Sequence, residues 1–429
     1  MRLTSLNPSR WGASGVAADT FYVLVTQVVS KGVLTALTVL MARGLSVEQF
    51  SRFNYFLVTT GVLTSYVALG LPLVASRVLS EGNLDHSWRK DPRTAAMLAL
   101  AVLASAGAVV ASPLFLPWLM ADEIRVSAPL IVIGALAAAW NAIGQAAMYA
   151  VRAFRQAFWP AMLATAFTCV AASLGVATDQ ALWPIVGNIL FYLAPVLLYW
   201  YHLKGAGVTP PHRAVLNPNR EAMGQTLAIA LPGLGVTVIY ATVNWLIART
   251  LVEHQSSPTQ FNEYLLGLQW VSLALFVPLG LGQAIFPRFV EASRAGASEV
   301  RAIVVPAAIT FGSVALIALT ASLATPVLDV VYGASYDFDP AFVFTVLLAG
   351  AFGGAVNLIG VYVMATRGTA AWFLANLASL GVALPLLSLN PPTSAFAAAR
   401  VLCGCYAALL TVASFAIWTH HRRSTVAPI

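Results

Sequence analysis

Long apolar runs recur along the whole chain and are separated by short polar segments. Each run has about 20 residues or more, the length that an α-helix needs to cross a hydrocarbon layer about 30 Å thick. The pattern predicts about twelve transmembrane helices and leaves no gap long enough for a soluble domain. We expect the spans at residues 19–43, 51–77, 93–118, 127–151, 156–177, 182–202, 224–249, 261–286, 301–328, 340–366, 369–389 and 394–419.

The composition agrees with an all-α polytopic membrane protein. Of the 429 residues, 59% are hydrophobic and only 9% are charged, whereas soluble domains carry about 25% charged residues. The net charge of +7 does not indicate a nucleic-acid partner, because cytoplasmic loops of membrane proteins are enriched in Lys and Arg. We therefore expect no nucleic acid among its partners and membrane lipid around most of its surface.

The distribution of basic residues predicts the orientation of the chain. If both termini are cytoplasmic, most Lys and Arg residues fall on the cytoplasmic side, as the positive-inside rule requires. The external side then keeps only Arg43, Arg52, Arg125, Arg249 and Arg400. An even number of spans with both termini cytoplasmic is consistent with this bias.

The chain contains an internal repeat. Two motifs of the first half return in the second half: Met41-Ala-Arg43 matches Ile247-Ala-Arg249, and Phe50-Ser-Arg-Phe53 matches Phe261-Asn-Glu-Tyr264. An arginine follows Phe50 and Phe261 at the same spacing, Arg77 in the first half and Arg288 in the second. The repeat predicts two six-helix lobes, at residues 1–203 and 223–429, joined by a cytoplasmic linker at 204–222. Two lobes with the same orientation are related by an axis along the membrane normal. Transporters built from two such lobes bind substrate between the lobes and work by alternating access.

A lysine near the middle of the first span is the sharpest chemical signal. A charge at that depth costs at least ~2.5 kcal/mol on insertion scales, so Lys31 is expected to face a cavity. No carboxylate lies at a comparable depth in any predicted span, so the lysine suits an anionic ligand. The alternative is a lysine that extends its ammonium group to water or the interface. Gln27 lies one turn from Lys31 and is expected on the same side of the helix.

Other polar residues inside predicted spans are candidates for the same cavity. Asn141, Gln145 and Tyr149 form a stripe at i, i+4 and i+8 in the fourth span, and Asn244 lies in the seventh. Polar residues also join membrane helices through interhelical hydrogen bonds. Both interpretations, ligand contact and helix pairing, remain open for each residue.

Four arginines lie at cytoplasmic helix ends: Arg77, Arg152, Arg155 and Arg288. One interpretation is that they anchor the helices at the lipid headgroups. The other is a cationic rim that meets the phosphates of a lipid entering from the cytoplasmic leaflet.

The sequence lacks the patterns of an enzyme. There is no Gly-rich phosphate loop, no pair of carboxylates within the spans and no Ser/His/Asp arrangement, so we expect no catalytic residues. The histidines have no metal-ligand spacing, and the three cysteines lie in apolar stretches. We therefore expect no metal site and no bound cofactor.

Several stretches resemble Wzx-type polysaccharide flippases. They are Met41-Ala-Arg-Gly-Leu-Ser-Val-Glu-Gln-Phe-Ser-Arg-Phe53, Ser76-Arg-Val-Leu-Ser-Glu81, Tyr149-Ala-Val-Arg152 with Arg155, Leu279-Gly-Leu-Gly-Gln-Ala-Ile-Phe-Pro-Arg288, and Val331-Tyr-Gly333 through Met364-Ala-Thr-Arg-Gly368. Their order covers nearly the whole chain. The resemblance places the chain with the polysaccharide transporters of the multidrug/oligosaccharidyl-lipid/polysaccharide (MOP) exporter superfamily, whose fold is MATE-like.

The resemblance implies a flippase that moves undecaprenyl-diphosphate-linked oligosaccharide across the bacterial inner membrane by alternating access, for cell-surface polysaccharide such as O-antigen. Lys31 fits a cationic cavity that receives the diphosphate, and Arg249 joins the expected cavity residues as the repeat mate of Arg43. The candidate driving forces are a coupling ion, H+ or Na+, and the membrane potential. A polysaccharide polymerase and other assembly proteins are the candidate protein partners.

The chain departs from the family pattern in two places. Asn244 stands where many members carry an acidic residue, which puts coupling through a carboxylate in doubt, and Ser51 replaces the glycine of a Phe-Gly-x-Phe pattern. Two other functions stay open: a multidrug-type exporter of the same superfamily and a membrane polysaccharide polymerase or ligase. The first requires carboxylates or aromatic boxes for cationic drugs, and the second requires a sizeable external loop.

Overall fold

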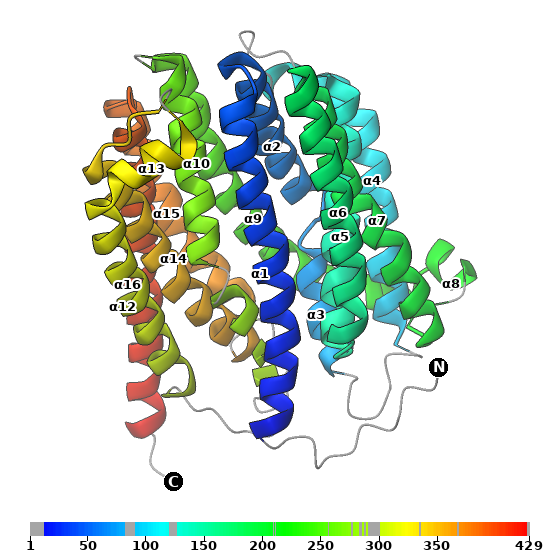
Figure 1. Cartoon of the computed structure of the whole chain (residues 1–429). Coiled ribbons are helices and arrows are strands. Elements are labelled where there is room, and N and C mark those ends of the chain that lie inside the picture. The colour runs from blue at the N-terminus through cyan, green and yellow to red at the C-terminus, as the bar shows by residue number, and fades with distance from the viewer. Residues whose placement is uncertain are drawn as a thin grey trace.

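The computed structural model describes most of the chain as one all-helical bundle (Figure 1). The described residues are 13–81, 91–119, 127–208, 210, 212–255, 257–275, 278–282, 285–286, 289–290, 301–333, 336–366 and 369–426; for some of them, Gln27 and Lys31 included, only the backbone is described.

Among the described residues, seven named helices belong to the first lobe and seven to the second. The first lobe contains α1 (Ala13–Gly44), α2 (Val47–Val67), α3 (Leu71–Glu81), α4 (Pro92–Leu119), α5 (Ala128–Ala150), α6 (Phe154–Thr178) and α7 (Leu182–Gly205). The second contains α9 (Arg220–His254), α10 (Pro258–Ala274), α12 (Arg301–Leu323), α13 (Thr325–Tyr332), α14 (Pro340–Thr366), α15 (Thr369–Leu389) and α16 (Ala395–Val426). The beginning of α1 and the end of α16 lie at the same end of the bundle, which we call the terminal end; the opposite end is the distal end (Figure 1).

The two lobes pack their helices in the same order. In the first lobe α6 contacts α1 and α7, while α5 contacts α2 and α7. In the second lobe α15 contacts α9 and α16, while α14 contacts α10 and α16. Replacing α1, α2, α5, α6 and α7 by α9, α10, α14, α15 and α16 therefore converts one set of contacts into the other. Between the lobes, α2 packs on α9 and α10 packs on α1, which preserves the same exchange.

Two glutamines show the repeat at the level of single atoms. Gln49 and Gln260 occupy the same place in the repeat, one residue before Phe50 and Phe261. The side-chain Oε1 of Gln49 accepts a hydrogen bond from the backbone N–H of Ala181, at the beginning of α7, at 3.0 Å. Oε1 of Gln260 accepts one from the N–H of Ala395, at the beginning of α16, at 2.7 Å. Each thus satisfies a backbone donor that a helix N-terminus leaves unpaired.

The predicted span at 51–77 is not one helix, which corrects the sequence-based prediction. Helices α2 and α3 meet at a break with a bend of 51°. Leu69 and Gly70 have positive φ angles of 49° and 67° there, which ends α2, and Pro72 lies in the first turn of α3, where proline is tolerated. A Cβ on Gly70 would lie 2.4 Å from the carbonyl oxygen of Ala230 in α9, so the break lets the two lobes approach closely.

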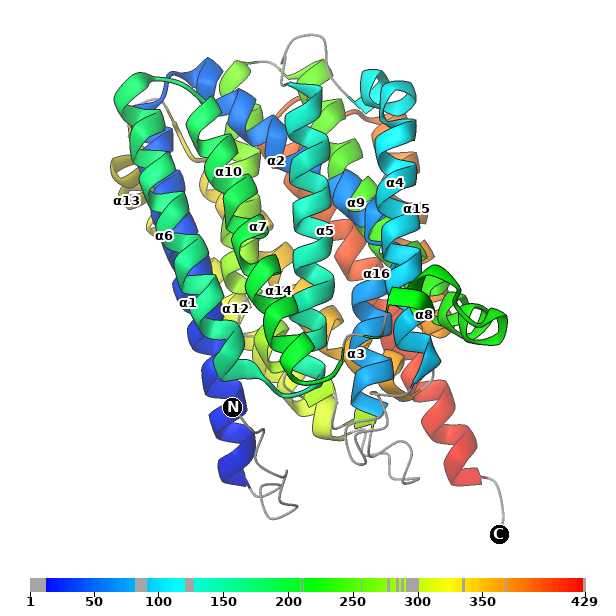
Figure 2. The ribbon, with the colours of Figure 1, turned by 90° about the vertical axis from the view of Figure 1, so that its right-hand side faces the viewer.

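Two other boundaries differ from the prediction. The span expected at 301–328 ends at Leu323, because the chain turns at Ala324 before α13 begins with Pro326 in its first turn. The expected linker at 204–222 contains the short helix α8 (His212–Leu216), which protrudes beside α4 (Figure 2). Neither change alters the direction in which later helices cross.

The prediction of about twelve spans agrees with the helices. Within the described residues, nine helices are long and apolar enough to cross a membrane, and the bent pair of α2 and α3 makes a tenth. The other two predicted spans coincide with α1 and with α10 and its continuation, the helical pieces at 278–282, 285–286 and 289–290. The protein is therefore a multi-pass membrane protein.

The apolar cores differ between the two ends of the bundle. The largest core contains residues of both lobes from the distal half, such as Phe50 and Phe56 of α2 with Phe261 and Tyr264 of α10. Toward the terminal end this joint core gives way to smaller cores: one around Met148 of α5 that includes Ala230 of α9, one of α12, α14, α15 and α16 residues, and one in which Leu73 of α3 packs against Phe286 and Val361. The lobes are therefore joined most extensively at the distal end.

Candidate functional site

A buried polar contact joins the lobes at the distal end. Nδ2 of Asn54 in α2 donates to Oδ1 of Asn262 in α10 at 3.0 Å, and Nδ2 of Asn262 donates to Oγ of Ser51 at 3.0 Å. Asn54 is 1% exposed and Asn262 is fully buried. We call this set the Ser51–Asn54–Asn262 clasp. Ser51 and Asn262 each follow the matched phenylalanine of their repeat, so the clasp joins residues that are repeat mates.

A cavity of about 310 Å³ lies between the lobes on the terminal side of this clasp. Helices α3 and α5 form its wall in the first lobe, and α14 with the continuation of α10 forms its wall in the second. We call it the interlobe cavity. It is lined by Pro72, Leu73, Ser76, Ala142, Gln145, Ala146, Tyr149, Ala150, Leu279, Gly282, Phe286, Asn357, Val361 and Met364.

Amide and hydroxyl groups carry the polar chemistry of the interlobe cavity. Nε2 of Gln145 donates to the hydroxyl of Tyr149 at 3.2 Å, which holds two members of the predicted stripe toward each other. Across the cavity, Oδ1 of Asn357 is buried and has no hydrogen-bond partner in the described structure. The third member of the stripe, Asn141, lies one turn along α5 and is not among the residues that line the cavity, although its buried Oδ1 also has no partner in the described structure. Unsatisfied polar atoms of this kind are costly unless a ligand or water pairs with them.

None of the described residues that line the interlobe cavity is charged. An uncharged lining of amides and hydroxyls, with apolar side chains between them, matches the hydroxyl groups and ring faces of a sugar better than a cationic drug, which requires carboxylates or aromatic boxes. Within the described part of the chain, no three His, Cys, Asp or Glu side chains gather in a way that could hold a metal ion.

The structure places two expected cavity residues elsewhere. Asn244 lines a separate cavity of about 250 Å³ between α2, α9, α10 and α16, and its Nδ2 donates to the carbonyl of Tyr240 at 2.8 Å. Arg249 lies near the distal end of α9, where Nε donates to Glu253 at 2.7 Å and the guanidinium lies over the Trp245 ring. It does not line the interlobe cavity.

The expected cationic rim is only partly described. Arg77 forms an ion pair with Glu81 at 3.2 Å, and Arg93 joins the same carboxylate at 3.0 Å, so Arg77 takes part in the contact of α3 with α4. Arg152 follows α5 with a φ angle of 57°, and Arg155 is exposed at the beginning of α6. Arg288 lies outside the described residues, as do the side chains of Lys31 and Gln27, whose backbones belong to α1.

Sequence reasoning did not identify the clasp. Asn54 and Asn262 lie near the beginnings of their spans, where a polar residue is ordinary at the membrane interface. The signal that could have found them is the repeat itself, because a residue can contact its own repeat mate only close to the axis that relates the lobes. Asn357 was visible as a polar residue in the tenth span, but its place opposite Gln145 depends on tertiary packing.

Solved structures of MATE transporters share this fold. The chain aligns with a MATE transporter in its straight conformation (TM-score 0.70, 14% identity, 96% of each chain) and with the Vibrio cholerae transporter VcmN (TM-score 0.70, 13% identity, 96% of this chain and 97% of that one). It also aligns with a MOP superfamily transporter from Pyrococcus furiosus whose binding pocket is described as having reverse polarity (TM-score 0.67, 14% identity, 96% of each chain). The class of protein is thus a helical membrane protein with the fold of the MATE transporters.

A curated relative narrows the comparison. The chain is 27% identical over 284 residues to the EPS I polysaccharide export inner membrane protein EpsE of Ralstonia solanacearum. The match covers 63% of this chain and spans 62% of the length of that relative. No model of a known protein family matches the chain. The resemblance to polysaccharide transporters of the MOP superfamily is thus supported by a relative as well as by the fold.

Proposed function

We propose that this protein is a flippase for a lipid-linked oligosaccharide, working in a bacterial inner membrane during synthesis of a cell-surface polysaccharide. The glycan headgroup enters the interlobe cavity from the terminal side, which is the cytoplasmic side in the proposed orientation. The hydrocarbon tail stays in the bilayer. The lobes then exchange their contacts, so that the cavity closes at the terminal end and opens at the distal end.

The observation that carries the proposal is a cavity between two lobes that are joined at the opposite end, with amide and hydroxyl groups and no charged side chain among its described lining residues. The Ser51–Asn54–Asn262 clasp and the shared core occupy the distal end, while the cavity lies toward the terminal end. Alternating access requires this arrangement, with one end closed while the other admits substrate. Similarity to a protein named for polysaccharide export supports the choice of a glycan substrate.

The proposed cycle makes or breaks no bond, so net movement of the glycan needs an outside source of free energy. We propose a coupling ion or the membrane potential for this purpose. The diphosphate of the lipid carrier is proposed to meet Lys31 and the arginines of the rim, because paired cations bind phosphate oxygens strongly. A polysaccharide polymerase on the external side would then take up the delivered glycan.

The first test is to delete the gene in its host and locate the lipid-linked oligosaccharide. Accumulation on the cytoplasmic face with loss of surface polysaccharide supports the flippase. Unpolymerised or unattached glycan on the outer face would instead indicate a polymerase or ligase. An unchanged glycan profile with greater sensitivity to cationic drugs would favour an exporter.

Complementation with cavity variants connects this phenotype to the site. Gln145→Leu and Asn357→Leu keep the side-chain size but remove the amide groups that face the interlobe cavity. Each is expected to reduce transport about tenfold, since a lost hydrogen bond to substrate costs about 1.4 kcal/mol. Gln225→Leu makes the same substitution at an exposed position of α9 and serves as the matched control. Equal transport by all three variants would refute the role of the cavity.

A further inference from the structure

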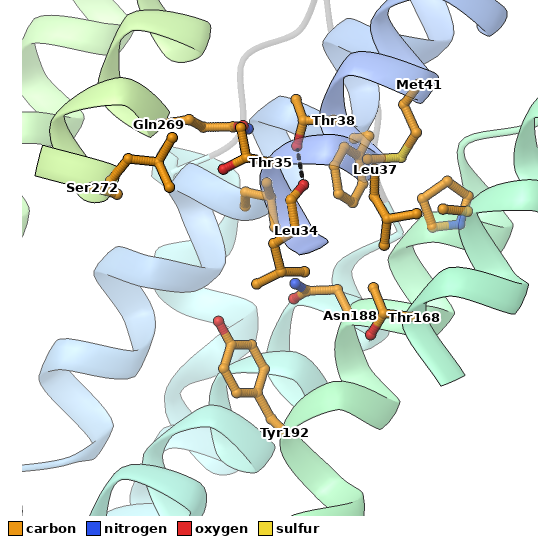
Figure 3. A pocket seen from close by; sticks show the side chains of 15 residues that line it. Leu34, Thr35, Leu37, Thr38, Met41, Thr168, Asn188, Tyr192, Gln269 and Ser272 are labelled. Atoms are coloured by element: carbon orange, nitrogen blue, oxygen red, sulfur yellow. Dashed lines mark hydrogen bonds between the residues drawn. The ribbon is translucent and has the colours of Figure 1, made fainter. Parts of the chain in front are cut away.

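A third cavity, of about 180 Å³, lies in the first lobe and against α10 (Figure 3). Its polar lining consists of Thr35, Thr38, Thr168, Asn188, Tyr192, Gln269 and Ser272. No described lining residue carries a charge. The volume is below the ~300 Å³ of pockets that take drug-sized ligands, so the space suits a small unit and not a whole oligosaccharide. We call it the first-lobe cavity.

The first-lobe cavity is the repeat mate of the cavity that contains Asn244, which we call the second-lobe cavity. The two cavities are lined by residues that occupy equivalent places in the repeat, as counted from Met41 and Ile247, Phe50 and Phe261, or Ala181 and Ala395. The matched pairs are Leu34 with Tyr240, Thr35 with Ala241, Thr38 with Asn244, Leu57 with Leu268, Val62 with Leu273, Val58 with Gln269, Gly61 with Ser272 and Tyr192 with Tyr406. The axis between the lobes therefore relates the cavities as well as the helices.

The two cavities differ at one informative pair. In the second-lobe cavity the hydroxyl of Tyr406 donates to the hydroxyl of Tyr240 at 2.9 Å, so one protein hydroxyl satisfies the other. In the first-lobe cavity Tyr192 takes the place of Tyr406, but Leu34 takes the place of Tyr240. The first-lobe cavity therefore lacks the hydroxyl that pairs with the matched tyrosine in the second-lobe cavity.

A nearby amide is left without a partner at this point. Asn188 is 7% exposed and lines the first-lobe cavity. Its side chain interacts with the hydroxyl of Tyr192, yet its Oδ1 has no hydrogen-bond partner in the described structure. Figure 3 shows Asn188 and Tyr192 directed into the same space, with Leu34 beside them. A buried acceptor without a partner in a polar cavity is a position where a ligand donor fits.

We propose that the first-lobe cavity binds one uncharged sugar residue, whose hydroxyl pairs with Oδ1 of Asn188 and with Tyr192. The ligand hydroxyl takes the role that Tyr240 has in the second lobe. The absence of charge among the described lining residues favours a neutral sugar over a phosphate or an acidic sugar. This inference deepens the proposed function and rests on it, because it assigns part of the glycan to a second binding place in addition to the interlobe cavity.

Binding of neutral sugars to the purified full-length protein in detergent tests the inference. The probes are the methyl glycosides of glucose, galactose, mannose and N-acetylglucosamine, and the lipid-linked glycan of the host. Saturation-transfer NMR detects weak binding of the methyl glycosides, and a pull-down detects binding of the lipid-linked glycan. Asn188→Leu is expected to weaken binding about tenfold, because it removes the acceptor while keeping the side-chain volume. Leu34→Tyr is expected to abolish binding, because it installs the hydroxyl found in the second lobe, which can pair with Tyr192 in place of the ligand hydroxyl.

Leu323→Tyr is the matched control, because it makes the same substitution at a side chain that is 79% exposed on α12. Binding of free glycosides that is lost in Leu34→Tyr but kept in Leu323→Tyr supports a monosaccharide site. Binding of the lipid-linked glycan alone, with the same dependence, supports the site with the carrier-linked sugar as its ligand. Binding that is equal in wild type and Leu34→Tyr, or seen with neither probe, overturns the inference. If gene deletion still causes the lipid-linked glycan to accumulate on the cytoplasmic face, the proposed flippase function stands even when the first-lobe cavity binds no sugar.

Discussion

Replacing Asn262 by leucine should loosen the contact between the lobes at the distal end. Asn262→Leu removes both hydrogen bonds of the clasp. Ser51 keeps a partner, because its Oγ also donates to the carbonyl of Val47 at 2.8 Å. Nδ2 of Asn54 loses its partner while it stays almost fully buried. The variant therefore strands one buried donor, and its effect should be set by that donor.

The size of the effect follows from the stranded amide. Leaving a buried donor unpaired costs about 2 kcal/mol, which corresponds to roughly a 30-fold change in a population ratio. Because the clasp joins the lobes, this cost falls on the state that is closed at the distal end. Asn54→Leu combined with Asn262→Leu removes both partners and should recover most of the loss, since an apolar pair leaves no amide unsatisfied.

Spin labels on the two lobes can measure this shift. Glu48 and Glu253 are exposed near the distal ends of α2 and α9, so labels there report the separation of the lobes. Asn262→Leu should populate a longer distance, and the double variant should return the distribution toward that of wild type. A double-mutant cycle then isolates the coupling between the two asparagines. Additive effects of the two single variants would refute the clasp as a cooperative contact.

Three further perturbations follow from local geometry. Gln49→Ala should lower the unfolding free energy by about 1 kcal/mol, because it removes the acceptor of one helix-start N–H, and Gln260→Ala should lower it by more, because Nε2 of Gln260 also donates to Glu263 at 2.9 Å; a melting shift of Gln49→Ala that equals or exceeds that of Gln260→Ala would contradict this reasoning. Gly70→Ala should abolish folded expression, since its Cβ would meet the α9 backbone, whereas Gly224→Ala, with open space around it, should leave expression intact. Tyr332→Phe should lower stability by about 1 kcal/mol, because the Tyr332 hydroxyl accepts a hydrogen bond from the indole N–H of Trp270 at 2.8 Å; unfolding monitored by tryptophan fluorescence measures the loss.

The helical architecture was predictable because it depends on length and hydropathy alone. A run of apolar residues long enough to cross the bilayer must be helical, since no other local structure satisfies its backbone groups there. The stripe of Asn141, Gln145 and Tyr149 was predictable for a similar reason, because residues four apart lie on one face of any helix. Gln145 and Tyr149 do face the interlobe cavity.

The break between α2 and α3 was not predictable from hydropathy. Leu69, Gly70 and Pro72 lie inside an apolar run, so the run has the length of one span although the backbone turns within it. The backbone of α9 lies against Gly70, at the second of the two positive φ angles, and this approach is a tertiary contact. Boundaries that depend on such contacts cannot be read from a window of hydropathy.

The repeat connects the fold to the proposed transport cycle. A contact between repeat mates such as Ser51 and Asn262 lies close to the axis that relates the lobes, so rotation of the lobes away from that axis at the distal end must break it. The glutamines that pair with α7 and α16 lie within single lobes and survive the same motion. Contacts inside a lobe can therefore be the same in both lobes and persist through the proposed cycle. Contacts between the lobes at the axis must form in the state that is closed at the distal end and break in the state that is open there. By this argument we expect the clasp to favour the state that is closed at the distal end, and Leu34 leaves the first-lobe cavity without the tyrosine hydroxyl that pairs with Tyr406 in the second lobe.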